Sequence, residues 1–251
     1  MHDNTGKISQ LSLVIPVLNE EENISSLAHE IAGIRKEEDS FEVIFVDDHS
    51  TDRTPEIIKD LTDRFSWVRT VRLSRQSGQS AALWHGIYAA RFPLIASMDG
   101  DGQNDLADIR HMVDVHRELS ADNPCCLVNG WRTGRQDSGW RKFCSRIANS
   151  IRSRLLKDNT PDSGCGIKIF SRETFLALPA FTHMHRFLPA LVRQRGGKVV
   201  SVPVNHRTRK SGKSHYGTMD RLFAGILDLL GVLWLGKRAI RLDLAGEREN
   251  E

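Results

Sequence analysis

The stretch LSLVIPVLNEEENISSLAHEIAGIRKEEDSFEVIFVDD, residues Leu11–Asp48, decides the fold. It begins with a short apolar run, Leu11–Val17, and continues into a segment, Glu20–Ile34, in which apolar residues recur every three or four positions. A second apolar run, Phe41–Val46, is rich in β-branched and aromatic residues. The order strand, helix, strand predicts a β-α-β unit, in which the two strands run parallel in one sheet.

The same alternation continues along the chain. Further elements are expected at Thr54–Phe65, Val68–Leu73, Ser80–Ala90 and Leu94–Met98, and then at Leu127–Asn129, Arg141–Leu156, Ile167–Phe170, His185–Arg195, Val199–Val204 and Thr218–Leu235. Thr54 and Pro55 are typical of a helix start, as an N-cap followed by proline at the first helical position. The pattern predicts the α/β class, with a mostly parallel central sheet flanked by helices and a Rossmann-like nucleotide-binding half.

Composition narrows the class of protein. The chain of 251 residues can hold one large α/β domain. Hydrophobic residues make up 39% and charged residues 27%, which is ordinary for a soluble globular protein. The net charge of +3 is too small to indicate a nucleic-acid partner. Arginine and lysine are concentrated in Arg132–Arg154 and Arg207–Lys213, which indicates either an anionic partner or a solvated basic face.

The sequence shows no pattern of a targeting or membrane-spanning segment. The first ten residues, MHDNTGKISQ, are polar and lack the apolar core of a signal peptide. No run approaches the roughly 20 apolar residues of a spanning helix. The four cysteines lack metal-ligand spacing, and a chain of this length needs no disulfides, which favours a reducing compartment. We therefore expect a cytoplasmic protein.

The segment MDGDGQND, Met98–Asp105, carries the strongest chemical signal. In parallel sheets ligands bind at the carboxyl ends of the strands, and here Asp99 and Asp101 leave an apolar strand on a glycine-rich turn. Two carboxylates at this spacing suit Mg²⁺ or Mn²⁺, which would bridge to a diphosphate. Gln103 offers a neutral oxygen nearby. The alternative is a polar Asp/Gly turn without a ligand.

A second acidic strand end lies in VIFVDDHSTDRT, Val43–Thr54. Asp47 or Asp48 can accept hydrogen bonds from a nucleobase or a ribose hydroxyl, as acids at strand ends do in dinucleotide-binding folds. The alternative is that Asp48, Ser50 and Asp52 shape the turn before the next helix. We expect both roles, with one aspartate left for the ligand. The first strand is not followed by Gly-X-Gly-X-X-Gly or by a Walker-type loop, so a dehydrogenase or a kinase loses its main support.

Four short blocks of the sequence together resemble a known family. IPVLNEEENI, VDDHSTDRT, SRQSGQSAAL and MDGDGQND, in this order, are similar to the family-two glycosyltransferases of the GT-A fold. The branch with dolichyl-phosphate mannosyltransferases and bacterial polyprenyl-phosphate glycosyltransferases also has blocks similar to DSGCGIKIFSRE (Asp162–Glu173) and PVNHRTRKSGKSHYG (Pro203–Gly217). The resemblance implies a GT-A domain over residues 1–217, followed by an amphipathic helix and polar tail over residues 218–251.

The resemblance also implies roles for particular residues. The nucleotide-sugar would be bound by Pro16, Val17, Glu20, Asp47 or Asp48, Arg75, Gln79 and Asp99. The metal ion, Mg²⁺ or Mn²⁺, would be held by Asp99, Asp101 and Gln103. The phosphates of donor or acceptor would be met by Arg207, Arg209, Lys213, Ser214 and Tyr216. The sequence departs from relatives at Leu106, Lys168 and His215, which usually hold proline, arginine and lysine, so the phosphate contacts carry over less directly than the metal site.

The implied reaction is an inverting transfer of a sugar from a nucleotide-diphosphate sugar to a polyprenyl phosphate. Asp99, Asp101 and the metal would neutralise charge on the departing nucleoside diphosphate. If the acceptor is instead a soluble or polysaccharide hydroxyl, a carboxylate must take its proton, and Asp162 is the candidate base. The alternative for Asp162 is a turn acid. A non-catalytic membrane-surface scaffold is a further alternative, which the clustered acids disfavour.

The segment Thr218–Arg238 predicts an amphipathic helix. Its apolar residues recur at steps of three and four, namely Leu222, Phe223, Ile226, Leu229, Leu230, Leu233 and Trp234. Lys237 and Arg238 at its end favour anionic headgroups, so we expect a peripheral protein at the inner face of a membrane. The alternative is packing on the protein's own core or on a second subunit, which leaves a homo-oligomer open.

Overall fold

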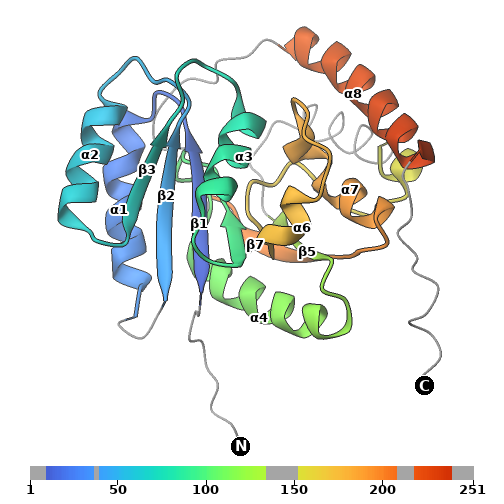
Figure 1. Cartoon of the computed structure of the whole chain (residues 1–251), viewed down its shortest axis with the longest axis horizontal. Coiled ribbons are helices and arrows are strands. Elements are labelled where there is room, and N and C mark those ends of the chain that lie inside the picture. The colour runs from blue at the N-terminus through green and yellow to red at the C-terminus, as the bar shows by residue number, and fades with distance from the viewer. Residues whose placement is uncertain (1–9, 37–39, 134–151, 208–217, 239–251) are drawn as a thin grey trace, which may run out of the picture.

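The computed structural model describes residues 10–36, 40–133, 152–207 and 218–238 (Figure 1). The first half contains β1 (Leu11–Val17), α1 (Glu21–Ile34), β2 (Phe41–Asp47), α2 (Thr54–Arg64), β3 (Val68–Arg72), α3 (Gln79–Ala89), β4 (Leu94–Ser97) and α4 (Ala107–Asp122). The second half contains β5 (Cys126–Thr133), β6 (Lys168–Ser171), α6 (Arg172–Leu176), the 3₁₀ turn η1 (Met184–Arg186), α7 (Leu188–Gln194), β7 (Lys198–Asn205) and α8 (Thr218–Arg238).

The strands form one seven-stranded sheet in the order β3-β2-β1-β4-β6-β5-β7. β6 runs antiparallel to its neighbours β4 and β5, and the other pairs are parallel. In register, Val14 of β1 lies between Ile44 of β2 and Ser97 of β4. Because β5 is antiparallel to β6, it points the same way as β1 to β4, and its carboxyl end lies at the same edge of the sheet.

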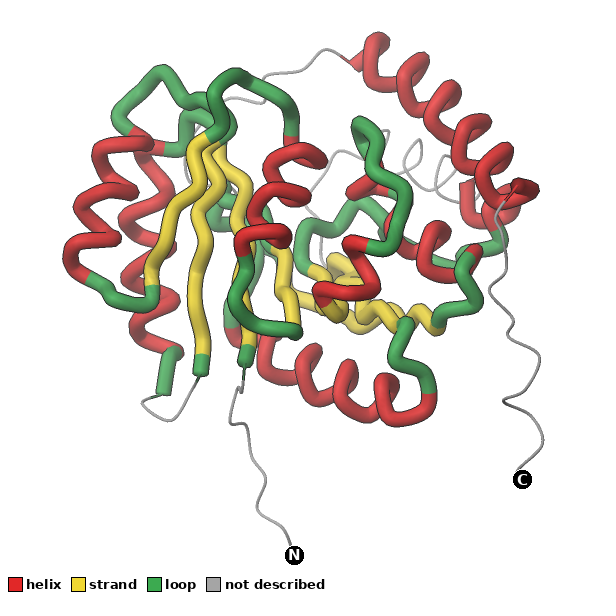
Figure 2. Tube along the Cα trace, in the orientation of Figure 1, coloured by secondary structure: helices red, strands yellow, loops and turns green. Residues whose placement is uncertain are grey.

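Helices cover both faces of this sheet, as the tube view shows (Figure 2). α1, α2 and α4 pack on one face with side chains such as Leu13 and Ile15 of β1. α3, α6, α7 and α8 pack on the other face with Val14, Ile44 and Phe170. Burial on both faces explains why β1 and β2 are continuous apolar runs and not alternating ones. The predicted α/β class, with a mostly parallel sheet between helices, is confirmed.

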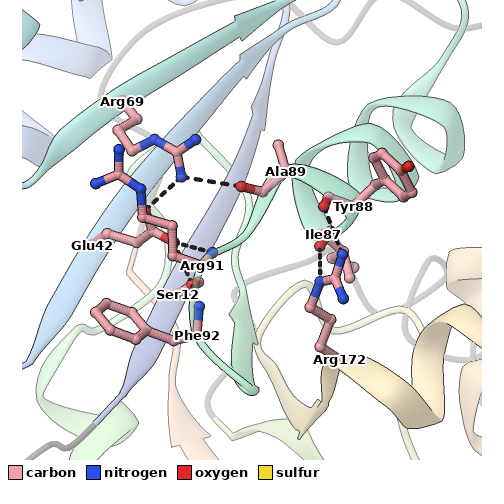
Figure 3. A network of polar contacts seen from close by, with 9 residues as sticks. All are labelled: Ser12, Glu42, Arg69, Ile87, Tyr88, Ala89, Arg91, Phe92 and Arg172. Carbon is pink, nitrogen blue, oxygen red and sulfur yellow. Dashed lines mark hydrogen bonds and ion pairs between the residues drawn. The ribbon is translucent and has the colours of Figure 1, made fainter.

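A polar network at the amino ends of the strands fixes the carboxyl end of α3 (Figure 3). α3 has no basic residue in its own last turn. Arg69 of β3 instead donates to the carbonyl of Ala89 at 3.0 Å. Arg172 donates through Nε to Ile87 at 3.0 Å and through Nη2 to Tyr88 at 2.8 Å. Cations at these carbonyls satisfy groups that a helix end leaves without partners.

Glu42, which is buried, lies at the centre of that network. Its carboxylate accepts hydrogen bonds from Ser12 Oγ at 2.6 Å, from the backbone N–H of Arg91 at 2.7 Å and from Arg69 at 2.7 Å. Burial acts to raise the pKa of Glu42, but these hydrogen bonds and the charge of Arg69 hold it below its ordinary value. The charge of Glu42 is therefore balanced within the protein, by Arg69 and by the hydrogen bonds from Ser12 and Arg91.

α8 has one face packed on the domain and one face exposed. Val232 is fully buried against the second core cluster, and Leu229 and Leu233 pack beside it. The exposed apolar face of α8 consists of Ile226, Leu227, Leu230 and Trp234, which are 48%, 69%, 57% and 60% exposed. No helix among the described residues has the length and apolar character needed to cross a bilayer. The helix was expected either to meet a membrane or to pack on protein. Packing on the protein's own core explains the buried face of α8 but not its exposed apolar face.

Several predicted elements differ from the structure. The helix expected at His185–Arg195 is divided into η1 and α7, because Pro189 lies in the first turn of α7 and proline starts a helix more readily than it continues one. Thr54 is the first residue of α2, and Arg53 occupies the N-cap position. α4 and α6 were not predicted. The helix expected at Arg141–Leu156 lies mainly outside the described residues. The part that is described, residues 152–156, is helical.

Candidate active site

The loops after β1 and β2 are bound to each other at the carboxyl edge of the sheet. The backbone N–H of Asn19 donates to Ser50 Oγ at 3.0 Å, and Asn19 Oδ1 accepts from the backbone of Thr51 at 2.8 Å. Asn19 has a φ of 55°, a left-handed conformation that asparagine tolerates. A pocket of about 310 Å³ opens beside these loops and is lined by Asn19, Glu20, Glu21, Glu22, Asn23, Thr51 and Asp52.

The residues expected at the nucleotide from β1 lie around this junction. Pro16 is partly buried, and Val17 is buried and accepts a backbone hydrogen bond from Asp48 at 2.9 Å. Glu20 lines the pocket and accepts from Asn23 Nδ2 at 2.6 Å, while its N–H donates to Thr54 Oγ1 at 2.9 Å. Pro16, Val17 and Glu20 therefore share one region, and their contacts with a nucleotide stay a prediction.

Asp47 and Asp48 are both buried and both engaged within the protein. Asp47 accepts from the backbone N–H of Ser50 at 2.8 Å, and its other oxygen lies 3.1 Å from Arg72 Nε. Asp48 accepts from the backbone N–H groups of Ser77 and Gly78 at 2.7 and 2.8 Å. Asp47 thus shapes the turn before α2, whereas Asp48 holds the loop after β3 and not that turn. The base or ribose contact stays a prediction for either.

The contacts of Asp48 join the start of α3 to the loop after β2, and Gln79 joins it to the loop after β4. Gly78 has a φ of 87°, which residues with a side chain rarely adopt, and the chain turns there into α3. Gln79, the first residue of the helix, donates through Nε2 to Asp99 Oδ1 at 2.8 Å. Arg75 in the preceding loop is exposed. Gln79 is thereby joined to the predicted metal site, whereas Arg75 shows no such contact among the described residues.

Close packing of two glycines orients the acidic turn. A Cβ added to Gly100 would lie 2.6 Å from Val17 Cγ1, so this glycine lets the turn pack on β1. A Cβ added to Gly166, just before β6, would overlap the carboxylate of Asp99. Asp101 accepts from the backbone N–H of Gln103 at 3.1 Å. The absence of a side chain at position 166 therefore makes room for the carboxylate of Asp99.

Asp99 carries an unfavourable charge. Burial raises the pKa of Asp99 to about 6, and the neighbouring charge of Asp101 adds to this, while Lys168, Arg132 and the hydrogen bond from Gln79 act in the opposite direction. A carboxylate that is buried next to a second carboxylate gains stability when a cation binds both. Asp99 and Asp101 therefore fit a divalent ion electrostatically as well as by their oxygen chemistry.

The rest of the coordination would come from outside the protein or from neutral oxygens. Among the described residues, no group of three or more histidine, cysteine, aspartate or glutamate side chains could hold a metal ion. A hard cation shared with a diphosphate can be held by one or two carboxylates, because Mg²⁺ and Mn²⁺ keep waters and phosphate oxygens as ligands. The amide of Gln103 donates through Nε2 to the carbonyl of Arg207 at 3.3 Å, and its oxygen is the end not used in that bond.

Two basic side chains from the second half of the chain lie near Asp99. Lys168, the first residue of β6, is buried and donates to the carbonyl of Cys165. Burial lowers its pKa, and the charge of Asp99 acts against that effect. Arg132 near the end of β5 has a raised pKa: burial acts to lower it, but hydrogen bonds and charge from Asp162 outweigh burial, so it stays a cation. Acids and cations thus meet at one edge of the sheet.

Asp162 forms a bidentate ion pair with Arg132. Arg132 Nε and Nη2 lie 2.7 and 2.8 Å from Oδ2 and Oδ1 of Asp162, which is buried. Both oxygens of the candidate base therefore already accept hydrogen bonds. The geometry favours a positioning role for Asp162, and its role as a general base stays a prediction without support from the described contacts.

Sequence reasoning missed Arg132 as an individual site residue and treated Lys168 only as a departure. A signal was present for Arg132, because it opens the basic segment and follows an apolar strand. The rule that ligands bind at carboxyl ends of strands was applied to the first four strands, and β5 points in the same direction. Lys168 begins its strand, and its position depends on the antiparallel insertion of β6.

The segment after β7 reaches the acidic turn. Asn104 and His206 form an antiparallel bridge, and the N–H of Arg207 donates to the carbonyl of Gln103 at 2.8 Å. The guanidinium of Arg207 lies 2.7 Å from Glu30 and 3.0 Å from Asp105. Phosphate binding by Arg207 would have to replace or share these contacts and stays a prediction. The other expected phosphate ligands, Arg209, Lys213, Ser214 and Tyr216, lie outside the described residues.

Fold and site together define an α/β protein of the GT-A type, with an acid pair at the sheet edge where such proteins bind their ligand. The family model for Glycosyl transferase family 2 matches residues 12–178, and the chain belongs to this family. The suspected resemblance to family-two glycosyltransferases is therefore confirmed.

Curated relatives carry more specific names. The chain is 37% identical over 230 residues to a dodecaprenyl-phosphate galacturonate synthase from Rhizobium johnstonii, covering 90% of this chain and 67% of that protein. It is 31% identical over 214 residues to an undecaprenyl-phosphate 4-deoxy-4-formamido-L-arabinose transferase from Edwardsiella ictaluri, covering 84% and 64%. The chain thus spans about two thirds of the length of these relatives.

Solved structures share the fold. A glucosyl-3-phosphoglycerate synthase from Mycobacterium tuberculosis, in complex with Mn²⁺, uridine-diphosphate-glucose and glycerol 3-phosphate, aligns with a TM-score of 0.65 at 18% identity, covering 95% of this chain and 82% of that one. The same enzyme in complex with Mn²⁺, uridine diphosphate and glucosyl-3-phosphoglycerate aligns with a TM-score of 0.64. At this identity the likeness concerns the fold, and the GT-A type predicted from the sequence is confirmed.

Proposed function

We propose that the protein transfers a sugar from a nucleotide-diphosphate sugar to a polyprenyl phosphate, with Mg²⁺ or Mn²⁺ at the acid pair. The observation that carries the proposal is the position of Asp99 and Asp101 at the edge of the sheet where Lys168 pairs with Ser97 of β4 and where Arg132 lies near the end of β5. The acids suit a cation bound to the donor diphosphate, and the cations suit a phosphate. The names of the curated relatives support a polyprenyl phosphate as the acceptor.

The ion, when bound, would supply neutralisation of charge on the departing nucleoside diphosphate. Asp99 and Asp101 would hold it, and Gln79 would keep the Asp99 carboxylate in its orientation through the 2.8 Å hydrogen bond. Arg132 and Lys168 would stabilise negative charge through fixed electrostatics in a partly buried site. These contributions require no group in the protein to change its protonation state.

The occupied carboxylate of Asp162 favours a phosphate acceptor over a hydroxyl acceptor. A hydroxyl must lose its proton during attack, and a base with a free oxygen must accept it. A phosphate monoester is already ionised at neutral pH and needs little help of this kind. Since both oxygens of Asp162 are bound to Arg132, the arrangement suits an acceptor that arrives charged.

A lipid-linked acceptor requires the protein to work at a membrane surface, and α8 is suited to this. Its exposed apolar face ends in Lys237 and Arg238, and the Arg238 guanidinium lies 5.9 Å from the centre of the Trp234 ring. An apolar face with basic residues at its end fits an anionic bilayer surface. We place the protein as a peripheral protein at the cytoplasmic face, where nucleotide sugars are available.

The test of the function is a transfer assay. A thermal-shift screen of UDP-, GDP- and dTDP-sugars with Mn²⁺ identifies the donor, because a ligand bound to the native state raises its melting temperature. The donor is then incubated with undecaprenyl phosphate or with a soluble oligosaccharide acceptor. Formation of a lipid-phosphate sugar supports the proposal. Transfer to the oligosaccharide alone would replace the acceptor, and stable donor binding without transfer to either would favour the scaffold.

Vesicle sedimentation tests the placement of α8. Leu227→Ser and Trp234→Ser remove apolar surface from its exposed face, and we expect each to weaken binding to anionic vesicles. Val200→Ser, at a 37% exposed valine of β7, is the matched control and should bind as the unchanged protein does. Equal binding of all three variants would contradict the placement.

A further inference from the structure

The 3₁₀ turn η1 joins the second half of the domain to the first turn of α3. His185 of η1 contacts Ser80 of α3 twice: its ring Nδ1 lies 2.8 Å from Ser80 Oγ, and its backbone N–H donates to the same oxygen at 3.3 Å. Ser80 is buried. The two residues are separated by 105 positions in the sequence, so the contact links distant parts of the fold.

Ser80 Oγ accepts from the backbone N–H of His185 and carries one hydroxyl proton, which it can donate to Nδ1 of the ring. Nδ1 accepts that proton in a neutral imidazole whose own proton is on Nε2. Burial, together with the charges of Arg186, Lys168 and His183, lowers the pKa of His185 to about 3, which agrees with a neutral ring. The contact therefore persists throughout the neutral pH range.

Gln79, the residue before Ser80, contacts the predicted metal ligand Asp99. Gln79 lies in the same first turn of α3 and donates to Asp99 Oδ1. Its side chain is exposed, and Gly78 before it has no side chain to pack. The far end of α3 is fixed by Arg69 and Arg172. The contact between Ser80 and His185 fixes the near end, from which Gln79 reaches Asp99.

η1 is itself anchored on its other side. His183 at its N-cap position lies 2.8 Å, Nδ1 to Oδ2, from Asp228 of α8. Phe187 and Met184 next to His185 are buried in the second core cluster. The ring of His185 is thus held between α3 and packed elements of the second half.

We propose that His185 is a positioning residue for the metal site: through Ser80 it fixes the first turn of α3, and with it the hydrogen bond from Gln79 that orients the Asp99 carboxylate. The inference rests on the proposed metal-dependent function. Groups that orient a metal ligand without touching the metal affect the affinity for the ion more than they affect the fold. Loss of the contact should therefore weaken cation binding while nucleotide contacts at the loops after β1 and β2 persist.

The experiment measures binding of Mn²⁺ by the full chain, with and without UDP, from the loss of the free-ion signal in electron paramagnetic resonance. Gln79→Ala should raise the dissociation constant roughly 10-fold or more, the effect typical of removing a group that orients a ligand. His185→Phe and Ser80→Ala should each raise it about fivefold. His185→Asn retains an acceptor near the position of Nδ1 and should recover most of the affinity. His85→Phe, at an exposed histidine of the same helix, is the control and should have no effect.

Turnover gives a second readout that a purely structural role would not produce. Raising the Mn²⁺ concentration should restore kcat of Ser80→Ala, because the ligands themselves are intact, and circular dichroism should show an unchanged fold. Ser80→Ala also keeps the test decisive if His185→Phe does not fold. Unchanged Mn²⁺ affinity in Ser80→Ala and Gln79→Ala would overturn the inference. A wild-type chain that binds no Mn²⁺ would overturn the proposed metal site itself, and the inference with it.

Discussion

The two ends of the central sheet treat a carboxylate that has lost much of its hydration in opposite ways. At the amino ends of the strands, Glu42 accepts hydrogen bonds from Ser12, Arg91 and Arg69, and its pKa is lowered. At the carboxyl ends, Asp99 faces a second acid, and its pKa is raised to about 6. Burial penalises both charges, but the protein offsets the penalty at one end only.

The difference indicates where stability and function are placed. The Glu42 network ties β1, β2 and β3 to the end of α3 and is complete without any ligand (Figure 3). The Asp99 site keeps an electrostatic conflict that a bound cation would relieve. Conflicts of this kind are found at functional sites because the ligand, and not the fold, completes the interaction. Variants at Asp99, Asp101 and Glu42 can either remove this difference between the two ends or measure it.

The largest effect is expected at the carboxyl end. Asp99→Asn and Asp101→Asn each remove a charge that would hold the ion, so transfer should fall by about 100-fold or more, as for other losses of transition-state electrostatics. Circular dichroism should show an intact fold, because neither side chain belongs to the core. Asp114→Asn, at a surface acid paired with Arg117, is the control. Wild-type turnover in either site variant with Mn²⁺ present would refute the site.

A smaller effect, on stability, is expected at the amino end. Glu42→Gln removes the charge that accepts from Arg69, Ser12 and Arg91, so the free energy of unfolding should fall by about 2 kcal/mol, within the range for hydrogen bonds to charged groups. The melting temperature should drop by roughly 4–8 °C in a domain of this size. Transfer at low temperature should be retained. A variant that melts with the wild type would show that the network contributes nothing net.

Asp99→Asn should move stability in the opposite direction. Without metal, the neutral amide no longer opposes Asp101, so the variant should melt about 2–4 °C above the wild type, the shift expected for roughly 1 kcal/mol. Addition of Mn²⁺ should raise the melting temperature of the wild type and not that of the variant. A metal-free variant that is less stable than the wild type would contradict the proposed conflict between Asp99 and Asp101.

The pH dependence of these two stability differences should have opposite signs. Asp99 has a raised folded-state pKa of about 6, so its ionisation costs stability as pH rises through 6. The advantage of Asp99→Asn should therefore be full at pH 8 and shrink toward pH 4. Glu42 has a lowered pKa, so its contribution is full at neutral pH and is lost as pH falls through the acidic range. Urea unfolding at pH 8 and pH 4.5 measures the Asp99 effect, and a further measurement near pH 3, below the ordinary pKa of a glutamate, measures the Glu42 effect. Parallel trends would refute the contrast.

The sequence predicted the donor half of the fold because its signals are local. β1 and β2 are buried on both faces and therefore read as continuous apolar runs, and the helix starting near Pro55 has its own start signal. The antiparallel direction of β6 could not be predicted in this way, since strand direction depends on partners far along the chain. The break at Phe187 between η1 and α7 was also missed, although Pro189 is a local signal.

For the site, acids at strand ends were predicted, whereas two of the nearby basic residues, Arg132 and Lys168, were not. Asp99 and Asp101 follow an apolar run directly, so position along the chain was sufficient. Lys168 and Gly166 become site residues only because β6 is inserted beside β4, where Ser97 Oγ donates to the carbonyl of Gly166 at 2.9 Å. The engagement of Asp48 with Ser77 and Gly78 could likewise not be read from spacing, because it depends on how the loop after β3 folds back.

The insertion of β6 also has a consequence for the order of folding. β1, β2, β3 and β4 can pair as soon as they leave the ribosome, whereas Gly166 follows its partner Ser97 by 69 residues. Until β6 has been synthesised, β4 is an open sheet edge. Open edges recruit other chains, so a truncated chain that ends before Gly166 should aggregate although all of its first four strands are present.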